Sequence, residues 1–145
     1  MRLHVDFCGG FAPPEERREK MQFSVWGVSY QNTPLTLRDK ASFSDTQKLA
    51  ALEALAEAGV AQAAVLSTCN RSEIYYMQAN REDSEAVRRL FLEKEPALAP
   101  CLFHWEGREA VAYLYQVAAG LRSLVLGEDQ ILGQVQDALA CARGA

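Results

Sequence analysis

The 145-residue sequence predicts an α+β domain in which an antiparallel sheet is packed against helices. Three observations lead to this expectation. Segments with the strand period of two are interspersed with segments of helical period. Glycine and proline residues fall between these segments. The order is strand, helix, strand, strand, helix, strand and then two helices, which is the split βαβ plan of ferredoxin-like sandwiches.

The first strand and the first long helix have the clearest local signals. Residues 23–30 alternate apolar with small or polar side chains, and Pro34 follows them. Ser44 and Gln47 have the spacing of a capping box, and Gly59 suits the C-terminal end of the helix that begins there. In chain order the expected elements are a strand at 23–30, a helical turn at 37–42, a helix between Ser44 and Gly59, strands at 61–68 and 72–79, a helix at 82–95, a strand at 101–105, a helix between Gly107 and Gly120, and a last helix at about 128–142.

Composition indicates an ordinary globular protein of the cytoplasm. About half the residues (49%) are apolar, and the net charge of −4 argues against binding nucleic acid by bulk charge. No apolar stretch approaches the length of a membrane span, and the N-terminus lacks the apolar centre of a signal peptide. The four cysteines, Cys8, Cys69, Cys101 and Cys141, are far apart and are interpreted as separate thiols without a metal site.

Residues 1–20 differ from the rest of the chain. They contain Gly9-Gly10, Pro13-Pro14 and a charged run, with neither helical nor strand periodicity. We expect a disordered leader here, followed by a single domain over residues 21–145. Met21 is an alternative start.

One cysteine lies in the stretch Ser67-Thr68-Cys69-Asn70-Arg71, which the pattern places in a turn between two strands. A thiol at a strand end can be exposed on a rigid support, and a nearby guanidinium such as that of Arg71 favours the reactive thiolate. Thr68, Asn70 and the backbone N–H groups of the turn are able to donate to an oxyanion. A cysteine in a turn is also common as a small filler, so spacing alone leaves both interpretations open.

A second polar cluster lies near the start of the last helix. Gly120 and Gly127 bracket an apolar loop, and Glu128, Gln130 and Gln134 follow it. The two glutamines are four residues apart and therefore share one helix face. Carboxamides and a carboxylate at this position suit a polar, zwitterionic ligand. A loop followed by a solvated first turn is the alternative.

Together the two stretches resemble the glutamyl-tRNA reductase family. The similarity rests on Ser67-Thr68-Cys69-Asn70-Arg71, on Gly120-Leu121-x-Ser123, and on Gly127-Glu128-x-Gln130-Ile131-Leu132-Gly133-Gln134. Gly27-Val28-Ser29 through Pro34, and Arg38, resemble the family's opening strand and turn. The resemblance extends over about residues 22–142, and its motifs are long and specific.

The resemblance implies that Cys69 is a catalytic nucleophile that attacks the ester carbonyl of glutamyl-tRNA and releases the tRNA. The thioester would then be reduced by NADPH to glutamate-1-semialdehyde, at the start of tetrapyrrole (5-aminolevulinate) biosynthesis. Arg71 would pair with the carboxylate of the glutamyl side chain. The substrate-binding residues implied in this way are Thr68, Asn70, Arg71, Ser123, Glu128, Asp129, Gln130 and Gln134.

The resemblance also implies domains beyond this chain. No G-x-G-x-x-G motif occurs in the sequence, so residues 21–145 would be the N-terminal catalytic domain. The NADPH-binding and dimerisation domains would be absent, with the C-terminal helices leading towards them and the homodimer confined to the full-length protein. Glutamyl-tRNA is the implied partner, and glutamate-1-semialdehyde aminomutase is a further candidate. Without its NADPH domain, the chain is expected to hydrolyse the ester slowly.

The chain departs from the family pattern at several positions. Tyr113 stands where the family has a histidine thought to assist catalysis, and Arg122 stands where an acidic residue is usual. Tyr30 and Thr33 also differ from the family. A tyrosine, with a pKa near ~10, donates hydrogen bonds but is a poor base at neutral pH. Two alternatives therefore stay open: a catalytically degenerate relic that binds glutamyl-tRNA or a partner, and an interaction module in which Cys69 is structural.

Overall fold

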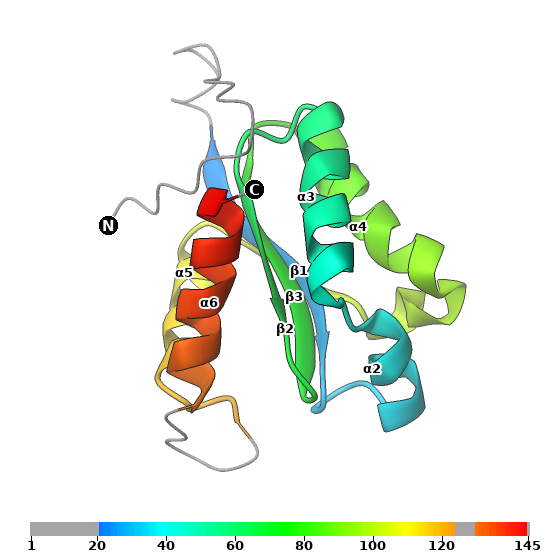
Figure 1. The fold of residues 1–145 in the computed structure, drawn as a ribbon, viewed down its shortest axis with the longest axis vertical. Helices are drawn as coiled ribbons and strands as arrows, with labels where there is room; N and C mark the ends of the chain where they lie inside the picture. The colour runs from blue at the N-terminus through cyan, green and yellow to red at the C-terminus, as the bar shows by residue number, and fades with distance from the viewer. Residues whose placement is uncertain (1–20, 124–129, 145) are drawn as a thin grey trace.

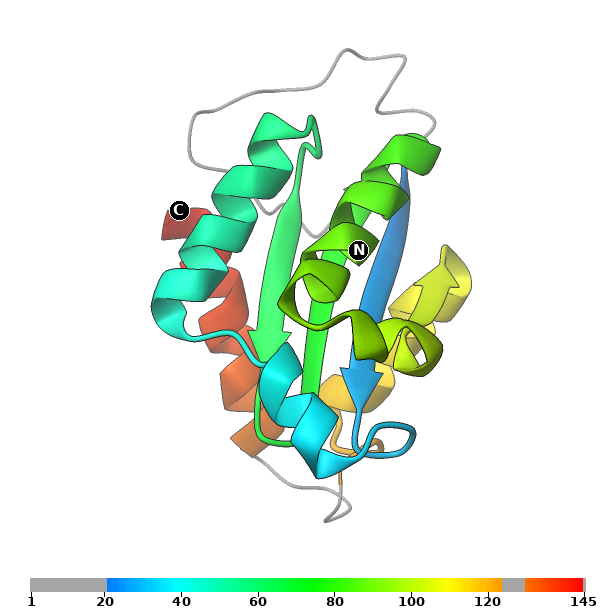
Figure 2. The same ribbon diagram turned by 90° about the vertical axis from the view of Figure 1, so that its right-hand side faces the viewer.

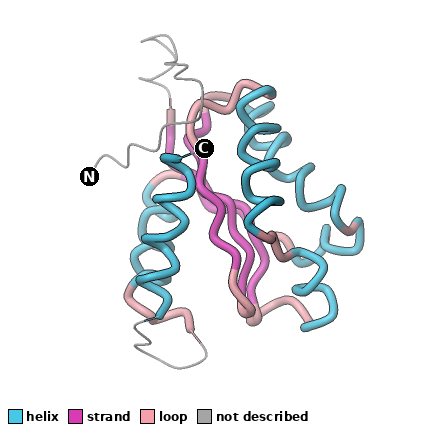
Figure 3. Tube along the Cα trace, in the orientation of Figure 1, coloured by secondary structure: helices cyan, strands magenta, loops and turns pink. Residues whose placement is uncertain are grey.

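The computed structural model describes residues 21–123 and 130–144. In this part of the chain, four strands form one antiparallel sheet in the order β2-β3-β1-β4. The strands are β1 (Gln22–Ser29), β2 (Ala63–Ser67), β3 (Arg71–Gln78) and β4 (Phe103–Glu106). The sheet runs between two layers of helices, as Figures 1 and 3 show. The strand order and the split βαβ connections confirm the predicted fold class.

One face of the sheet is covered by the helices that connect the strands. These are α2 (Leu35–Ala41), α3 (Asp45–Glu57), α4 (Arg81–Lys94) and the 3₁₀ helix η1 (Pro96–Cys101). Helices α3 and α4 lie side by side across the strands in Figure 2. Their apolar side chains, including Leu52, Leu55 and Phe91, bury against Val28 and Ile74 of the sheet to form the larger core.

The opposite face carries α5 (Arg108–Ala118) and α6 (Gln130–Gly144). Val117 of α5 and Ala138 of α6 pack over Val25 and Leu66 to form a second core. The two C-terminal helices therefore close the sheet into a three-layer structure. α5 ends and α6 begins at the end of the sheet where β2 turns into β3 (Figure 1).

The local signals of the sequence are confirmed at the helix ends. Ser44 and Gln47 form both hydrogen bonds of the capping box, with N–O distances of 3.2 and 2.9 Å. Gly59 and Gly120 follow α3 and α5 with φ of 91° and 77°, which a side chain would strain. The strand expected at 101–105 begins only at Phe103, because Pro96 and Pro100 favour η1 over an earlier start. The expected leader at 1–20 lies outside the described residues.

Candidate functional site

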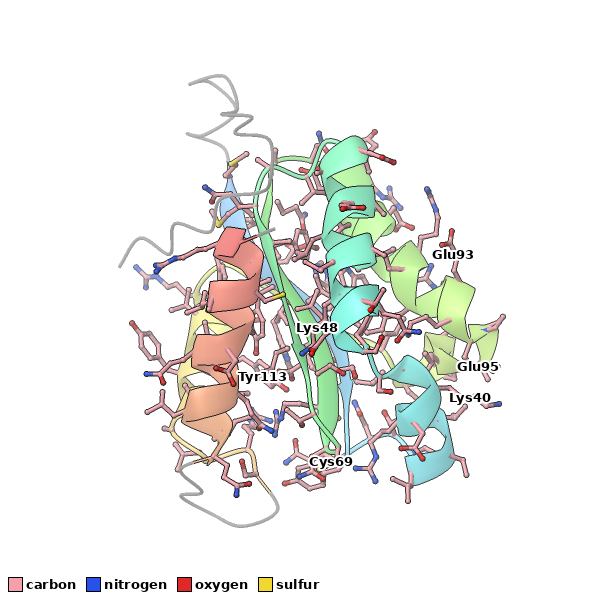
Figure 4. All side chains as sticks on the ribbon, in the orientation of Figure 1. Lys40, Lys48, Cys69, Glu93, Glu95 and Tyr113 are labelled. Atoms are coloured by element: carbon pink, nitrogen blue, oxygen red, sulfur yellow. The ribbon has the colours of Figure 1, made fainter. Side chains whose placement is uncertain are left out.

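Cys69 lies at the tip of the tight turn that joins β2 to β3, and its side chain is exposed (Figure 4). Three hydrogen bonds fix the turn's backbone: Thr68 N to Arg71 O (2.8 Å), Asn70 N to Thr68 Oγ1 (3.1 Å) and Tyr30 N to Asn70 O (2.8 Å). The turn is thus closed on itself and tied to the end of β1. The thiol is accessible while its support is rigid, as a nucleophile requires.

Directly behind the turn, Arg71 begins a buried cluster of polar side chains. Only 2% of Arg71 and none of Glu73 is exposed. The two residues are two apart on β3, so both point to the face covered by α5 and α6. Nη1 of Arg71 lies 3.5 Å from Oε2 of Glu73 and donates to the hydroxyl of Tyr113 at 3.3 Å. The hydroxyl of Tyr113 in turn donates to Oε2 of Glu73.

The carboxylate of Glu73 also accepts a hydrogen bond from a second phenol. Tyr75 donates to its other oxygen, Oε1, at 2.9 Å. Burial raises the pKa of Glu73 above its usual range, and the Arg71 guanidinium opposes this shift. Burial and the neighbouring carboxylate raise the pKa of Tyr113, so its phenol is a proton donor and not a base at neutral pH.

Arg71 joins the turn to the segment that follows α5. Its Nη2 donates to the backbone carbonyl of Arg122. The side chain of Arg122 lies over the ring of Tyr113, 5.1 Å from its centroid, and donates to Oε1 of Gln116 at 2.8 Å. The Cys69 stretch therefore meets the start of the second stretch at one contact, between Arg71 and the carbonyl of Arg122.

The remaining predicted site residues have fewer contacts with the Cys69 turn or are not described. Ser123 is half-buried just after α5, where its backbone N–H donates to Gly120 O at 3.3 Å. Gln130 and Gln134 are exposed on the first turns of α6, and no hydrogen bond in the described part of the chain joins them to the Cys69 turn. Glu128 and Asp129 lie outside the described residues. Arg71, for which the family resemblance implies a substrate carboxylate as partner, is paired with Glu73 in this structure.

Glu73 and Tyr75 were missed by the sequence reasoning. The signal was present: in Arg71-Ser72-Glu73-Ile74-Tyr75, charged and phenolic residues occupy alternate positions of a strand. Such residues share one face, and a strand in the middle of a covered sheet has no solvated face. Opposite charges two residues apart in a buried strand therefore indicate an internal pair.

The described residues do not fit a nicotinamide dinucleotide. The doubly wound fold that binds this ligand places it at a glycine-rich turn between a parallel strand and a helix, whereas the described sheet is wholly antiparallel. The strand-to-helix connections place Pro34, Asn80 and Gly107 at the helix starts, one glycine among three. Over residues 21–123 and 130–144, no helix is long and apolar enough to cross a membrane, and no metal-ligand cluster is found.

Comparisons with known proteins agree on one family. The family model of the glutamyl-tRNA(Glu) reductase N-terminal domain matches residues 26–145. The glutamyl-tRNA reductase of Clostridium novyi (strain NT) is 42% identical over 123 residues, which are 82% of this chain and 30% of that protein. The enzyme of Xanthomonas campestris pv. phaseoli is 44% identical over 124 residues, covering 85% of this chain and 28% of its own length.

A solved structure shows the same relationship. Glutamyl-tRNA reductase from Methanopyrus kandleri superimposes with a TM-score of 0.69 at 30% identity, over 83% of this chain and 28% of that one. The chain thus spans about 30% of the length of the relatives it matches. On the sequence match and the fold, the chain belongs to the glutamyl-tRNA reductase N-terminal domain family.

Proposed function

We propose that this chain performs the acyl-transfer step of glutamyl-tRNA reduction, with Cys69 as the nucleophile. The Cys69 thiolate attacks the ester carbonyl carbon of glutamyl-tRNA, a C–S bond forms, and the bond to the ribose oxygen breaks. The tRNA leaves as its 3′-terminal alcohol after taking up a proton. The product on the protein is a glutamyl thioester.

The observation that carries this proposal is the exposed thiol on a rigid turn. Cys69 is the exposed cysteine among the described ones, whereas Cys101 and Cys141 are half-buried. The turn's backbone is fixed by its own hydrogen bonds and by Tyr30. Thr68 and Asn70 flank the thiol and supply donors for the developing oxyanion.

Arg71, at the start of β3, supports the Cys69 turn from its buried side. Its guanidinium pairs with Glu73 of the same strand and donates to the hydroxyl of Tyr113 on α5 and to the carbonyl of Arg122. We propose that this cluster orients the site and supplies a cation close to the bound glutamyl group. Hydride transfer from NADPH, which the family resemblance implies, is assigned to no residue of this chain.

The test is the intact mass of the chain after incubation with glutamyl-tRNA. The parent protein should gain one glutamyl group, or release free glutamate if water takes the acyl group. Cys69→Ser should do neither, and the matched control Cys101→Ser should behave like the parent. Because tRNA affinity can depend on further domains, a small activated glutamate ester at high concentration is run in parallel. No adduct and no release with either substrate would overturn the proposal.

A second candidate is a domain that binds glutamyl-tRNA without turnover. It is favoured by Tyr113, which stands at the position of the family histidine and whose raised pKa keeps its phenol protonated at neutral pH. In that case glutamyl-tRNA binds with the same affinity to the parent and to Cys69→Ser, and no thioester accumulates. The mass experiment separates the two functions.

A further inference from the structure

Arg122 places a second guanidinium beside the Cys69 turn. Its Nη1 lies 3.5 Å from Oε1 of Gln31. Gln31 follows Tyr30, whose backbone N–H donates to the carbonyl of Asn70 in the Cys69 turn at 2.8 Å. The guanidinium of Arg122 therefore lies between the end of α5 and the segment to which the Cys69 turn is tied.

Neutral partners hold this side chain in place. Its Nε donates to Oε1 of Gln116 at 2.8 Å, and its guanidinium lies over the ring of Tyr113, 5.1 Å from the centroid. Together with Gln31, these partners are two carboxamides and one phenol, and none of them carries a negative charge. Within residues 21–123 and 130–144, the positive charge of Arg122 is therefore held in position without an acidic partner.

Arg71, the other guanidinium near the turn, offers much less to a ligand. Only 2% of it is exposed, and its charge is paired with that of Glu73. Its terminal nitrogens also donate to Tyr113 and to the carbonyl of Arg122. Arg122 is half-buried, and its contacts with described residues use two of the five N–H donors of a guanidinium. An anionic group held next to Cys69 can therefore pair with Arg122 without displacing a buried carboxylate.

We propose that Arg122 is a specificity-determining residue, which binds the side-chain carboxylate of a glutamyl group whose carbonyl carbon is at Cys69. This assignment rests on the acyl transfer proposed above. A guanidinium forms two parallel hydrogen bonds with a carboxylate, whereas a carboxamide of the same shape presents one oxygen acceptor and a donating NH₂ group. The site should therefore prefer a glutamyl to a glutaminyl group. Because an acidic residue is usual at this position of the family, the contact is particular to this chain.

The experiment measures the second-order rate constant with which the chain is acylated by a small activated glutamate ester and by the matching glutamine ester. The parent should react about tenfold or more faster with the glutamate ester, and Arg122→Gln should remove this preference, because a charge-assisted pair with the carboxylate is lost. Arg122→Lys keeps the charge and should keep part of the preference. The matched control Arg108→Gln removes the same charge at the exposed start of α5 and should keep the parent's ratio.

A smaller folded fraction lowers both rate constants together, so their ratio reports on the contact itself. If Arg122→Gln does not fold, Arg122→Met removes the charge and keeps an apolar stem over the Tyr113 ring. An unchanged ratio in the folded variant overturns the assignment, as does a parent that reacts equally fast with both esters. Acylation of the parent by neither ester overturns the proposed function instead, and this assignment with it.

Discussion

Replacing Gly27 by alanine should destabilise the protein strongly, although the change adds a single methyl group. Gly27 lies on β1 directly opposite Glu73 of β3. A Cβ there would come within 2.8 Å of both Cγ of Glu73 and the backbone carbonyl of Ser72. The absence of a side chain at this position makes room for the buried Glu73.

The loss of stability depends on whether the atoms next to the added methyl group can shift. The Glu73 side chain is fully buried and held by two phenols, and the Ser72 carbonyl belongs to the sheet backbone. Overpacking a core costs about 1–3 kcal/mol, and a backbone collision places Gly27→Ala near the top of this range, at about 2–3 kcal/mol. At roughly 4 °C per kcal/mol, the fall in Tm is roughly 8–12 °C.

Gly133 supplies the matched control. It lies in α6, and an added Cβ meets nothing within 4 Å. Gly133→Ala should therefore stabilise the helix by about 0.5–1 kcal/mol. Both variants and the parent are unfolded in urea, with the midpoint and slope recorded. A parent-like midpoint for Gly27→Ala, with Gly133→Ala stabilised, would refute the argument that β1 and β3 leave no room opposite Glu73.

Three further changes test other contacts by the same urea unfolding. Ser44→Ala removes one half of the capping box of α3 and should cost about 1 kcal/mol; an unchanged midpoint would contradict that role. Tyr113→Phe removes a donor from the buried Glu73 carboxylate and should cost about 1–3 kcal/mol, whereas parent-like stability would show the bond to be dispensable. Burial lowers the pKa of His104, which stacks on Trp26, so the unfolded chain takes up this proton more readily than the folded one. The free energy of unfolding should then fall as the pH drops below about 6.5, and His104→Gln should lessen the dependence; an equal slope in both proteins would argue against it.

Much of the fold was predictable because its signals are local. The capping box at Ser44 and Gln47, the glycines after two helices and the alternation of the first strand depend on neighbouring residues alone. The start of the fourth strand was placed two residues early. An apolar run after Pro100 looks extended in sequence, but Leu98 is fully buried within η1 and holds that segment in helical form.

The candidate site was only partly predictable, because its parts depend on pairing across the sheet and between layers. The exposed thiol of Cys69 follows from its position in a turn. The burial of Arg71 does not, since it requires Glu73 on the same face and Tyr113 from a helix 42 residues further along the chain. A residue that looks free in sequence can thus be committed to a partner that only the tertiary structure supplies.

The pairing of Arg71 changes how its mutants must be interpreted. Removing one partner of a buried ion pair commonly costs about 3–5 kcal/mol, because the other charge stays buried without compensation. Arg71→Ala would therefore leave Glu73 unpaired and release the Arg122 carbonyl, whatever the substrate does. Loss of acyl transfer in that variant is evidence for substrate binding only if the urea midpoint is unchanged. A glutamyl carboxylate that reaches this guanidinium must share it with Glu73. The binding free energy that Arg71 contributes is therefore the difference between its interaction with the substrate carboxylate and its interaction with Glu73.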